Sequence, residues 1–194
     1  VLEAAAYLLK RGLLSVERTA AINVKQGRAL MVAAAGLQYR KSKEWLEAGL
    51  LSEEGRPRNQ VLLQDLEMIL TGAAGTGKTT TLLVIEALID FFYEPGVLCK
   101  SAPTITASRL LGGNTSHALY KLPRCTLHGK RGKLSAAVLK KYRKLWGKAQ
   151  AHAVDEISVT APASLFQIEA RSRTAKNELT RKFGGLLTIL LGDF

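Results

Sequence analysis

Cysteine is scarce in this chain of 194 residues, which contains only Cys99 and Cys125. Two cysteines without metal-ligand spacing exclude a disulfide-stabilised scaffold and a cysteine-based zinc site, and they favour a reducing compartment. Long apolar runs are also absent, because none reaches the roughly 18 residues that span a bilayer. The sequence therefore predicts no membrane-spanning helix. The chain does not begin with Met, so we expect its natural N-terminus, with any targeting segment, to be missing.

Acidic residues are missing from one long stretch of the chain. The formal net charge is +12, yet residues 95–154 contain twelve Lys and Arg side chains and no Asp or Glu. A domain with such a basic stretch should attract polyanions, and nucleic acid is the first candidate. The alternative is a solvated basic face without a function, and charge alone does not separate the two.

The pattern of apolar residues predicts a helical N-terminal segment over residues 1–60, ending in a polar loop, and an α/β domain over residues 61–194. Short apolar runs predict strands at 66–70, 97–102, 151–154 and 186–191. Helical periodicity or turn signals predict helices at 78–92, 105–111 and 135–150. Strands that alternate with helices indicate a parallel sheet with helices on both faces. In the last helix, the expected apolar face consists of Val138, Tyr142, Leu145 and Ala149.

A glycine-rich segment, GAAGTGKTT, occupies residues 72–80. It matches the phosphate-loop pattern, in which two glycines five positions apart precede Lys and Thr. The glycines let successive N–H groups point at phosphate oxygens, and the following helix directs its positive end at the same anion. We therefore predict a P-loop NTPase fold that binds ATP and Mg²⁺, with Lys78 at the outer phosphates and the Thr79 hydroxyl on the metal. The predicted nucleotide-binding residues are Gly72, Ala73, Ala74, Gly75, Thr76, Gly77, Lys78, Thr79 and Thr80.

An acidic pair, Asp155 and Glu156, follows the predicted strand at 151–154. A P-loop enzyme needs an acid to hold its metal and another to activate water, so we assign Asp155 to Mg²⁺ and Glu156 to the attacking water. Most such pairs are surface acids, but this one ends the acid-free stretch and follows Val154. The strand itself is less apolar than a buried central strand usually is.

Hydroxyl-bearing residues gather at two turns that follow the second predicted strand. Thr104 and Thr115 lie in or near these turns, where hydroxyls can meet phosphates. His117, taken alone, is more typical of a helix start. Tyr142 and Trp146 are expected to pack inward rather than to stack on bases.

Several segments together resemble the Pif-type, RecD-like DNA helicases of superfamily one, over about residues 20–194. They are GAAGTGKTT, SAPT, ASRLLGGNTSHALYKLP, VDEIS and FGGLLTILLGDF, in this order. The resemblance implies a RecA-like motor domain that hydrolyses ATP and moves 5′ to 3′ along single-stranded DNA. It also implies roles in DNA repair, recombination and telomere maintenance, and a place in the nucleus or, alternatively, the mitochondrion.

The resemblance also assigns roles to single positions. It places Gly75–Thr79 on the triphosphate, and it places Thr104, Thr115 and His117 on the DNA backbone. In INVKQGRAL, Asn23 and Gln26 are similar to the family's adenine-reading motif, and Gln26 would be the reader of the base.

The sequence departs from the family pattern at several points. Ile105 stands where the family usually has Gly, and Val159 stands where Met is common. A second RecA-like domain with an arginine finger, worth roughly 10³–10⁵ in rate, is expected C-terminal to Phe194. We therefore expect the chain alone to bind ATP weakly and not to unwind DNA.

Two other functions are compatible with the residues. The first is a nucleic-acid-binding module with an inactive P-loop, which the basic segment 121–148 and the weak strand before Asp155 favour. The second is a P-loop ATPase of another branch, such as a loader or a nucleotide kinase.

Overall fold

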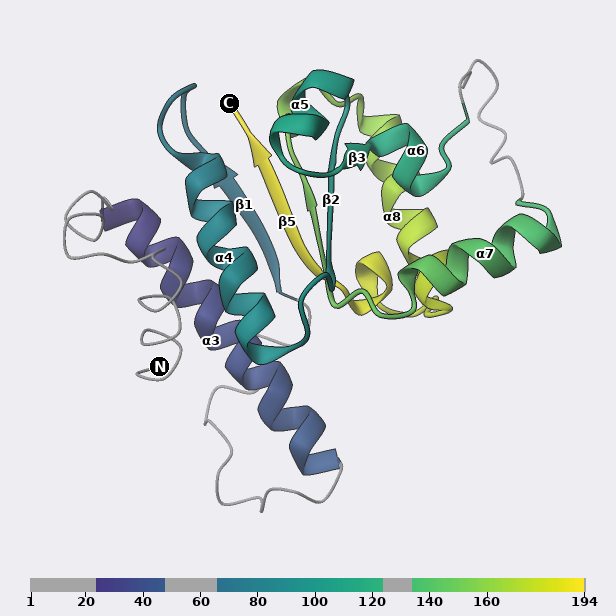
Figure 1. The fold of residues 1–194 in the computed structure, drawn as a ribbon, viewed down its shortest axis with the longest axis horizontal. Helices are drawn as coiled ribbons and strands as arrows, with labels where there is room; N and C mark the ends of the chain where they lie inside the picture. The colour runs from purple at the N-terminus through teal and green to yellow at the C-terminus, as the bar shows by residue number, and fades with distance from the viewer. Residues whose placement is uncertain (1–23, 48–65, 124–133, 194) are drawn as a thin grey trace. The chain divides into compact units, whose positions relative to one another are not determined.

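The computed structural model describes residues 24–47, 66–123 and 134–193 (Figure 1). By their internal contacts these residues divide into two units. The first comprises Val1–Leu66 and Ala74–Val97, and the second comprises Glu67–Ala73 and Leu98–Phe194. The predicted domain boundary after residue 60 lies outside the described residues and stays a prediction.

In the described part of the first unit, the helices α3 (Val24–Glu47) and α4 (Lys78–Phe92) pack against each other. Helix α3 is rich in alanine and leucine and buries Ala33 and Leu37. Helix α4 repeats apolar residues at helical spacing and buries one continuous face, as predicted. It ends at Phe92, shortly before Pro95, which cannot continue a helix. The described part of the helical N-terminal segment is therefore confirmed, whereas the polar loop expected at 52–60 lies outside the described residues.

The second unit is built on a five-stranded sheet in the order β1-β5-β4-β2-β3. Every neighbouring pair of strands is parallel. The strands are β1 (Glu67–Thr71), β2 (Leu98–Ala102), β3 (Asn114–Thr115), β4 (Ala151–Val154) and β5 (Leu187–Gly192). The predicted parallel sheet is therefore confirmed, with the four expected strands and the additional short strand β3.

Strand β4 lies in the middle of this sheet, between β5 and β2, and all four of its residues are buried. Its small alanines leave room for helices on the two faces, and His152 is accommodated by hydrogen bonds to buried neighbours. Parallel strands buried on both faces are usually bulky and apolar. The AHAV segment shows that a central strand can instead carry small side chains and one polar side chain, because neighbouring residues hydrogen-bond to His152.

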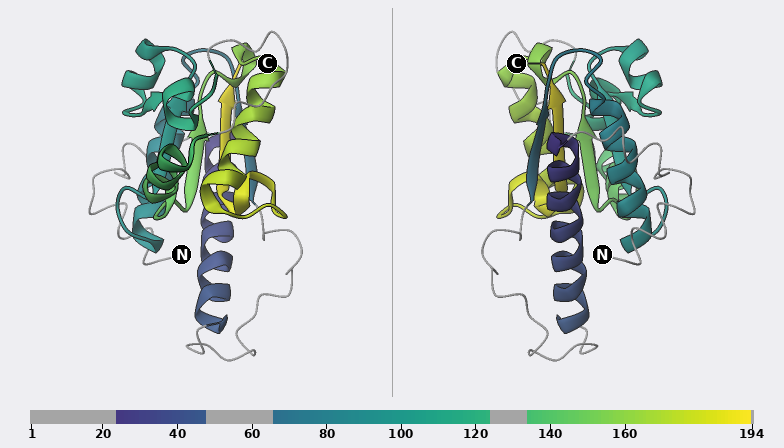
Figure 2. Two further views of the ribbon diagram at one scale, coloured as in Figure 1. Left: turned by 90° about the vertical axis from the view of Figure 1, so that its right-hand side faces the viewer. Right: turned by 90° about the vertical axis from the view of Figure 1, so that its left-hand side faces the viewer.

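Over the residues that the structure describes, the second unit also contains the α-helices α5 (Ile105–Leu110), α6 (Ser116–Tyr120), α7 (Ala136–Trp146) and α8 (Pro162–Lys176). Two short 3₁₀ turns, η2 (Ile157–Val159) and η3 (Lys182–Gly185), follow β4 and α8. Figure 2 shows α5 on one side of the sheet and α8 on the other, so the prediction of helices on both faces is confirmed. Among the described helices, none is long and apolar enough to cross a membrane.

The apolar face of α7 differs from the expected one. Tyr142 and Trp146 are buried, with exposed fractions of 2% and 0%, whereas Val138 and Leu145 are 40% and 58% exposed. The helix packs against α8 and turns Tyr142 and Trp146 toward a core cluster with Ile168. The inward packing of the two aromatic residues is therefore confirmed, and the assignment of Val138 and Leu145 to the apolar face is wrong.

Candidate functional site

The glycine-rich loop joins β1 to α4, as the phosphate-loop pattern requires. Gly75 and Gly77 have φ angles of +79° and +84°, in the left-handed region that favours glycine. Gly77 is the N-cap of α4 and brings no side chain to the helix end. The start of α4 is therefore not capped by the Gly77 position, and a helix N-terminus of this kind attracts anions. Lys78 is half-buried at the first helical position, and Thr79 and Thr80 are exposed beside it.

Gln26, the predicted adenine reader, lies near the start of α3 and contacts this loop directly. Its side-chain amide nitrogen donates a hydrogen bond of 2.9 Å to the Thr76 carbonyl oxygen. A Cβ atom at Gly77 would lie 2.5 Å from the same nitrogen, so a larger residue there would displace the Gln26 amide. The structure therefore brings Gln26 together with the predicted phosphate loop, while Asn23 lies outside the described residues.

The carboxyl ends of the sheet strands carry the polar segments that the sequence singled out. The register pairs Thr71 with Gly192 and Val154 with Leu190, so the ends of β1, β5 and β4 lie side by side. Gly72 follows β1 at this edge, and Asp155 follows β4. In parallel α/β sheets, ligands bind at this edge, where loops leave the strands.

Asp155 and Glu156 form a constrained turn at the end of β4. The Asp155 amide donates to the Ser101 carbonyl oxygen at 2.8 Å, and its carboxylate Oδ1 accepts from the Glu156 amide at 2.8 Å. Glu156 has a φ of +52°, a left-handed conformation that costs a non-glycine residue roughly 1–2 kcal/mol. Such strain is concentrated at functional sites. Asp155 and Glu156 are both half-buried, and no sequence pattern predicts the left-handed conformation.

The predicted DNA contacts lie at the same edge of the sheet. Ala102 pairs with Thr115 in the β2–β3 register, and Thr104 follows two positions after Ala102. Both threonines are helix N-caps: Thr104 Oγ1 accepts from the Ala107 amide at 3.2 Å, and Thr115 Oγ1 accepts from the Ala118 amide at 3.3 Å. Each hydroxyl thus still has its own proton to donate. His117 is exposed in the first turn of α6, next to Thr115.

A chain of buried polar groups links α6 to the centre of the sheet, and no local sequence pattern predicts it. The Tyr120 hydroxyl lies 2.7 Å from His152 Nδ1, and His152 Nε2 lies 2.8 Å from Thr188 Oγ1. Thr188 Oγ1 in turn donates to the Leu186 carbonyl oxygen at 3.3 Å. This direction makes Nε2 the protonated nitrogen and Nδ1 the acceptor from Tyr120. Complete burial lowers the pKa of His152 from 6.5 to about 3, so the imidazole is neutral.

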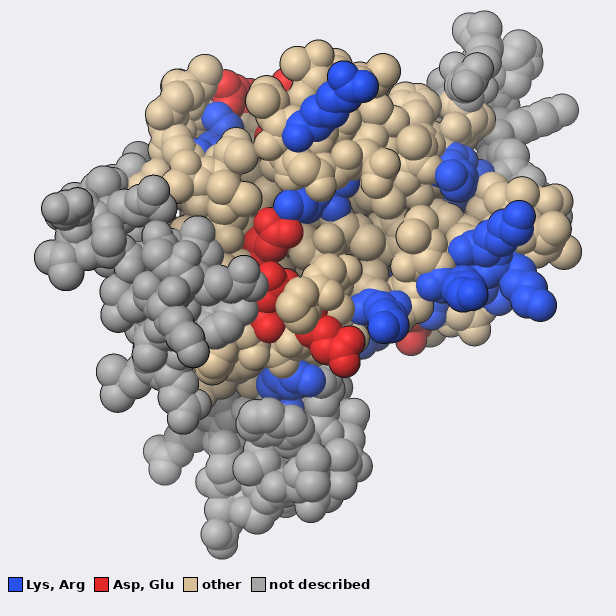
Figure 3. Space-filling view, viewed as in Figure 1, with Lys and Arg blue, Asp and Glu red and all other residues tan. Residues whose placement is uncertain are grey.

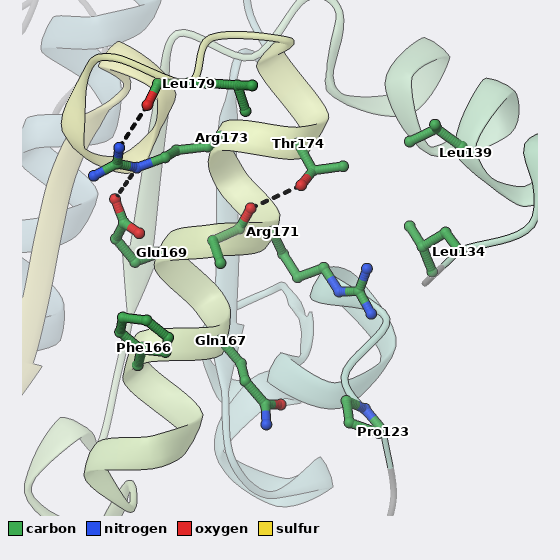
Figure 4. A pocket seen from close by; sticks show the side chains of 11 residues that line it. Pro123, Leu134, Leu139, Phe166, Gln167, Glu169, Arg171, Arg173, Thr174 and Leu179 are labelled. Carbon is green, nitrogen blue, oxygen red and sulfur yellow. Dashed lines mark hydrogen bonds and ion pairs between the residues drawn. The ribbon is translucent and has the colours of Figure 1, made fainter. Parts of the chain in front are cut away.

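A pocket of about 670 Å³ lies beside α8 (Figure 4). Phe166, Gln167 and Thr174 of α8 line it, together with Leu139 of α7. Arg173 is held there by Glu169 and by a 2.6 Å hydrogen bond to the Leu179 carbonyl oxygen. None of the residues predicted to carry chemistry lines this pocket.

Comparison with known proteins gives a consistent match. The family described as PIF1-like helicase matches residues 59–194. The chain is 32% identical over 129 residues to the ATP-dependent DNA helicase PIF6 of Trypanosoma brucei brucei, covering 66% of this chain and 16% of that protein. It is 28% identical over 151 residues to human ATP-dependent DNA helicase PIF1, covering 74% of this chain and 22% of that protein. The chain thus spans less than a quarter of these two relatives.

Solved structures show the same similarity. The Pif1 helicase from Bacteroides, in complex with ADP-AlF₃ and single-stranded DNA, matches with a TM-score of 0.53 and 29% identity, over 67% of this chain and 29% of that one. The Pif1 helicase from Candida albicans matches with a TM-score of 0.52 and 27% identity, over 68% and 30% of the two chains.

Proposed function

Because the chain belongs to the PIF1-like helicase family, we propose that it is part of the first RecA-like motor domain of an ATP-dependent DNA helicase. In this proposal the chain binds ATP and single-stranded DNA, and the whole protein moves 5′ to 3′ along the strand. The observation that carries the proposal is the loop at residues 72–80, which joins the parallel edge strand β1 to a helix without a side-chain cap. Membership of this family disfavours a P-loop ATPase of another branch.

Different groups in and beside the loop bind different parts of the nucleotide. Main-chain amides of residues 75–79 bind phosphate oxygens, since glycines at two left-handed positions turn them inward. The Lys78 ammonium group neutralises the outer phosphates. Gln26, already hydrogen-bonded to Thr76, positions the base relative to the loop.

The acidic pair supplies the metal and water functions of the proposal. We assign Mg²⁺ to Asp155 and Thr79, which are hard oxygen donors. No group of three His, Cys, Asp or Glu side chains in the described ranges could hold a metal by itself. The two oxygen donors Asp155 and Thr79 suit Mg²⁺, because this ion usually takes one or two protein ligands together with phosphate oxygens and water. When bound, the ion neutralises charge on the phosphates, while Glu156, fixed by its left-handed turn, orients the attacking water.

The nucleic-acid part of the proposal rests on the hydroxyls at the β2 and β3 ends. Thr104 and Thr115 donate to phosphate oxygens, and His117 contacts the same strand from the first turn of α6. A second RecA-like domain C-terminal to this chain completes the site with an arginine finger. Roles in DNA repair, recombination and telomere maintenance follow from the family. The nuclear location, with the mitochondrion as the alternative, stays a prediction.

The test is a titration of the chain with a fluorescent ATP analogue in the presence of Mg²⁺. Lys78→Ala should weaken binding at least about tenfold, because it removes a charge-assisted contact to the phosphates. Lys182→Ala is a matched control, since Lys182 is exposed and pairs with Glu67 at 3.8 Å, and it should leave affinity unchanged. Equal affinity of the Lys78 variant and the parent chain would refute the assignment. A chain that binds DNA but no nucleotide would instead support the alternative of a module with an inactive P-loop.

A further inference from the structure

The outer face of α7 is a row of lysines on a rigid support. With about 100° of rotation per residue, Lys140, Lys141 and Lys144 fall within about 100° of one another on the helix surface. Lys148 extends the row beyond Gly147, which keeps helical angles of −55° and −42°. The buried residues Tyr142 and Trp146 lie on the opposite face, so packing fixes the direction in which the lysines point. All four lysines are exposed, and Figure 3 shows basic side chains gathered over this helix.

No acidic residue lies on α7 itself or in the segments that flank it in the sequence. Residues 95–154 contain no Asp or Glu, so α7 and both flanking segments are purely basic. The helix packs against α8, whose Glu169 is engaged by Arg173. Arg143, at the border of the row, turns its guanidinium toward the Thr174 carbonyl oxygen at 3.2 Å. Among the residues that the structure describes, none of the four lysines makes an ion pair.

The spacing and chemistry of this row indicate the kind of partner. One helical turn separates Lys140 from Lys144, a rise of about 6 Å. Duplex DNA carries one phosphate charge per roughly 1.7 Å of axis, so each ammonium group on such a row finds a phosphate without an exact register. Binding of unpaired strands normally adds aromatic side chains on which bases stack. The two aromatic residues of α7 are both buried, with exposed fractions of 2% and 0%, so this face offers charge alone.

We propose that the lysine face of α7, formed by Lys140, Lys141, Lys144 and Lys148, binds the phosphate backbone of duplex DNA. This surface is separate from Thr104, Thr115 and His117, to which the proposed function assigns the single strand. It holds the double-stranded part of a substrate by charge, without reading its sequence. Binding there needs no nucleotide, so the surface is tested independently of the phosphate loop.

The experiment measures binding of the full 194-residue chain, without nucleotide, to a labelled blunt duplex and to a single strand of the same length. Replacing the four lysines with glutamine should lower duplex affinity at least about tenfold at low salt. It should also reduce the slope of log affinity against log salt by roughly 3 to 4, since each lost phosphate contact contributes about 0.9. Single-strand affinity should change much less than duplex affinity. The variant with four arginines keeps the charge and should retain the duplex affinity and slope.

Three results would overturn the proposal. The first is a glutamine variant that binds duplex with unchanged affinity and slope. The second is an equal loss for duplex and single strand, which would mean that the face acts only through overall charge. The third is competition by an acidic polypeptide as strong as that by duplex of equal charge. Lys144→Gln alone should lower the slope by about 0.9, which gives a measurement even where the fourfold variant folds poorly. Lys78→Ala should leave duplex binding intact, so loss of nucleotide binding and loss of duplex binding are distinguishable.

Discussion

Protonation of one buried histidine should destabilise the fold in mild acid. His152 lies on the central strand, fully buried, with Tyr120 on one ring nitrogen and Thr188 on the other. Burial lowers its pKa to about 3, compared with 6.5 for the group in an exposed chain. The folded state therefore binds this proton more weakly than the unfolded state does. The free energy of unfolding should be unaffected by His152 above pH 6.5 and should fall as the pH drops from 6.5 toward 3.

The size of the effect follows from the shift in pKa. One pKa unit corresponds to about 1.4 kcal/mol, so lowering the pH to about 4.5 should remove roughly 3 kcal/mol of stability. Below pH 3 the loss approaches roughly 5 kcal/mol. A domain of this size is stabilised by only about 5–15 kcal/mol, so a loss of this size is a large share of the total stability.

Urea unfolding at about pH 7 and pH 4.5, followed by circular dichroism, measures the loss. The comparison is with His152→Gln, which can hydrogen-bond to both neighbours but does not titrate. Carboxylates contribute equally to the loss of stability in both proteins. The difference between the two losses of unfolding free energy therefore measures the contribution of His152. The glutamine variant should lose roughly 3 kcal/mol less than the parent chain between these two pH values. Equal losses, or an imidazole that titrates in the folded protein near pH 6.5, would refute the reasoning.

Two glycine substitutions test the packing at the sheet and at the loop. Gly113→Ala should lower stability by about 1–3 kcal/mol in a thermal melt, because its Cβ would collide with the Lys100 main chain beside the β2–β3 pairing. Gly147→Ala, whose Cβ would meet nothing closer than 3.4 Å, is the control and should not destabilise. Gly77→Ala should weaken nucleotide binding about tenfold, because alanine is strained at φ +84° and displaces the Gln26 amide. Gly27→Ala on α3 meets nothing within 4 Å and should leave affinity unchanged, so equal effects of the two changes would contradict the role of Gly77.

The sequence was sufficient for elements whose signal is local. The strand, loop and helix around residues 66–92 combine an apolar run, glycines at fixed spacing and helical periodicity, and each feature is independent of the rest of the chain. The turn positions of Thr104 and Thr115 were predicted from local signals in the same way, whereas their roles as helix N-caps were first shown by the structure.

Features that depend on distant partners could not be predicted. Strand β3 has two residues, which carry no periodicity, and it exists because Ala102 offers a pairing partner. Helix α8 keeps Phe166 56% exposed while it buries Ile168, so its apolar residues do not mark one clear stripe. Val138 and Leu145 were assigned to the wrong face of α7 because the crossing with α8, and not hydrophobicity alone, decides which residues are buried. The left-handed Glu156 depends on contacts of the β4 end that no local pattern encodes.

The order of the strands in the sheet brings motifs together that are far apart in the chain. Along the chain, the segments after β1, β2 and β3 precede those after β4 and β5, yet in the sheet β4 lies between β5 and β2. The proposed metal ligand Asp155, at the end of β4, therefore lies between the ends of β5 and β1 on one side and the proposed DNA contacts after β2 and β3 on the other. Its amide bonds directly to Ser101, whose hydroxyl lies 3.3 Å from that of Ser116 at the start of α6. Ser101 of β2 thus joins the β4 end to the start of α6 through two hydrogen bonds, so that segments far apart in the chain become neighbours at this edge of the sheet.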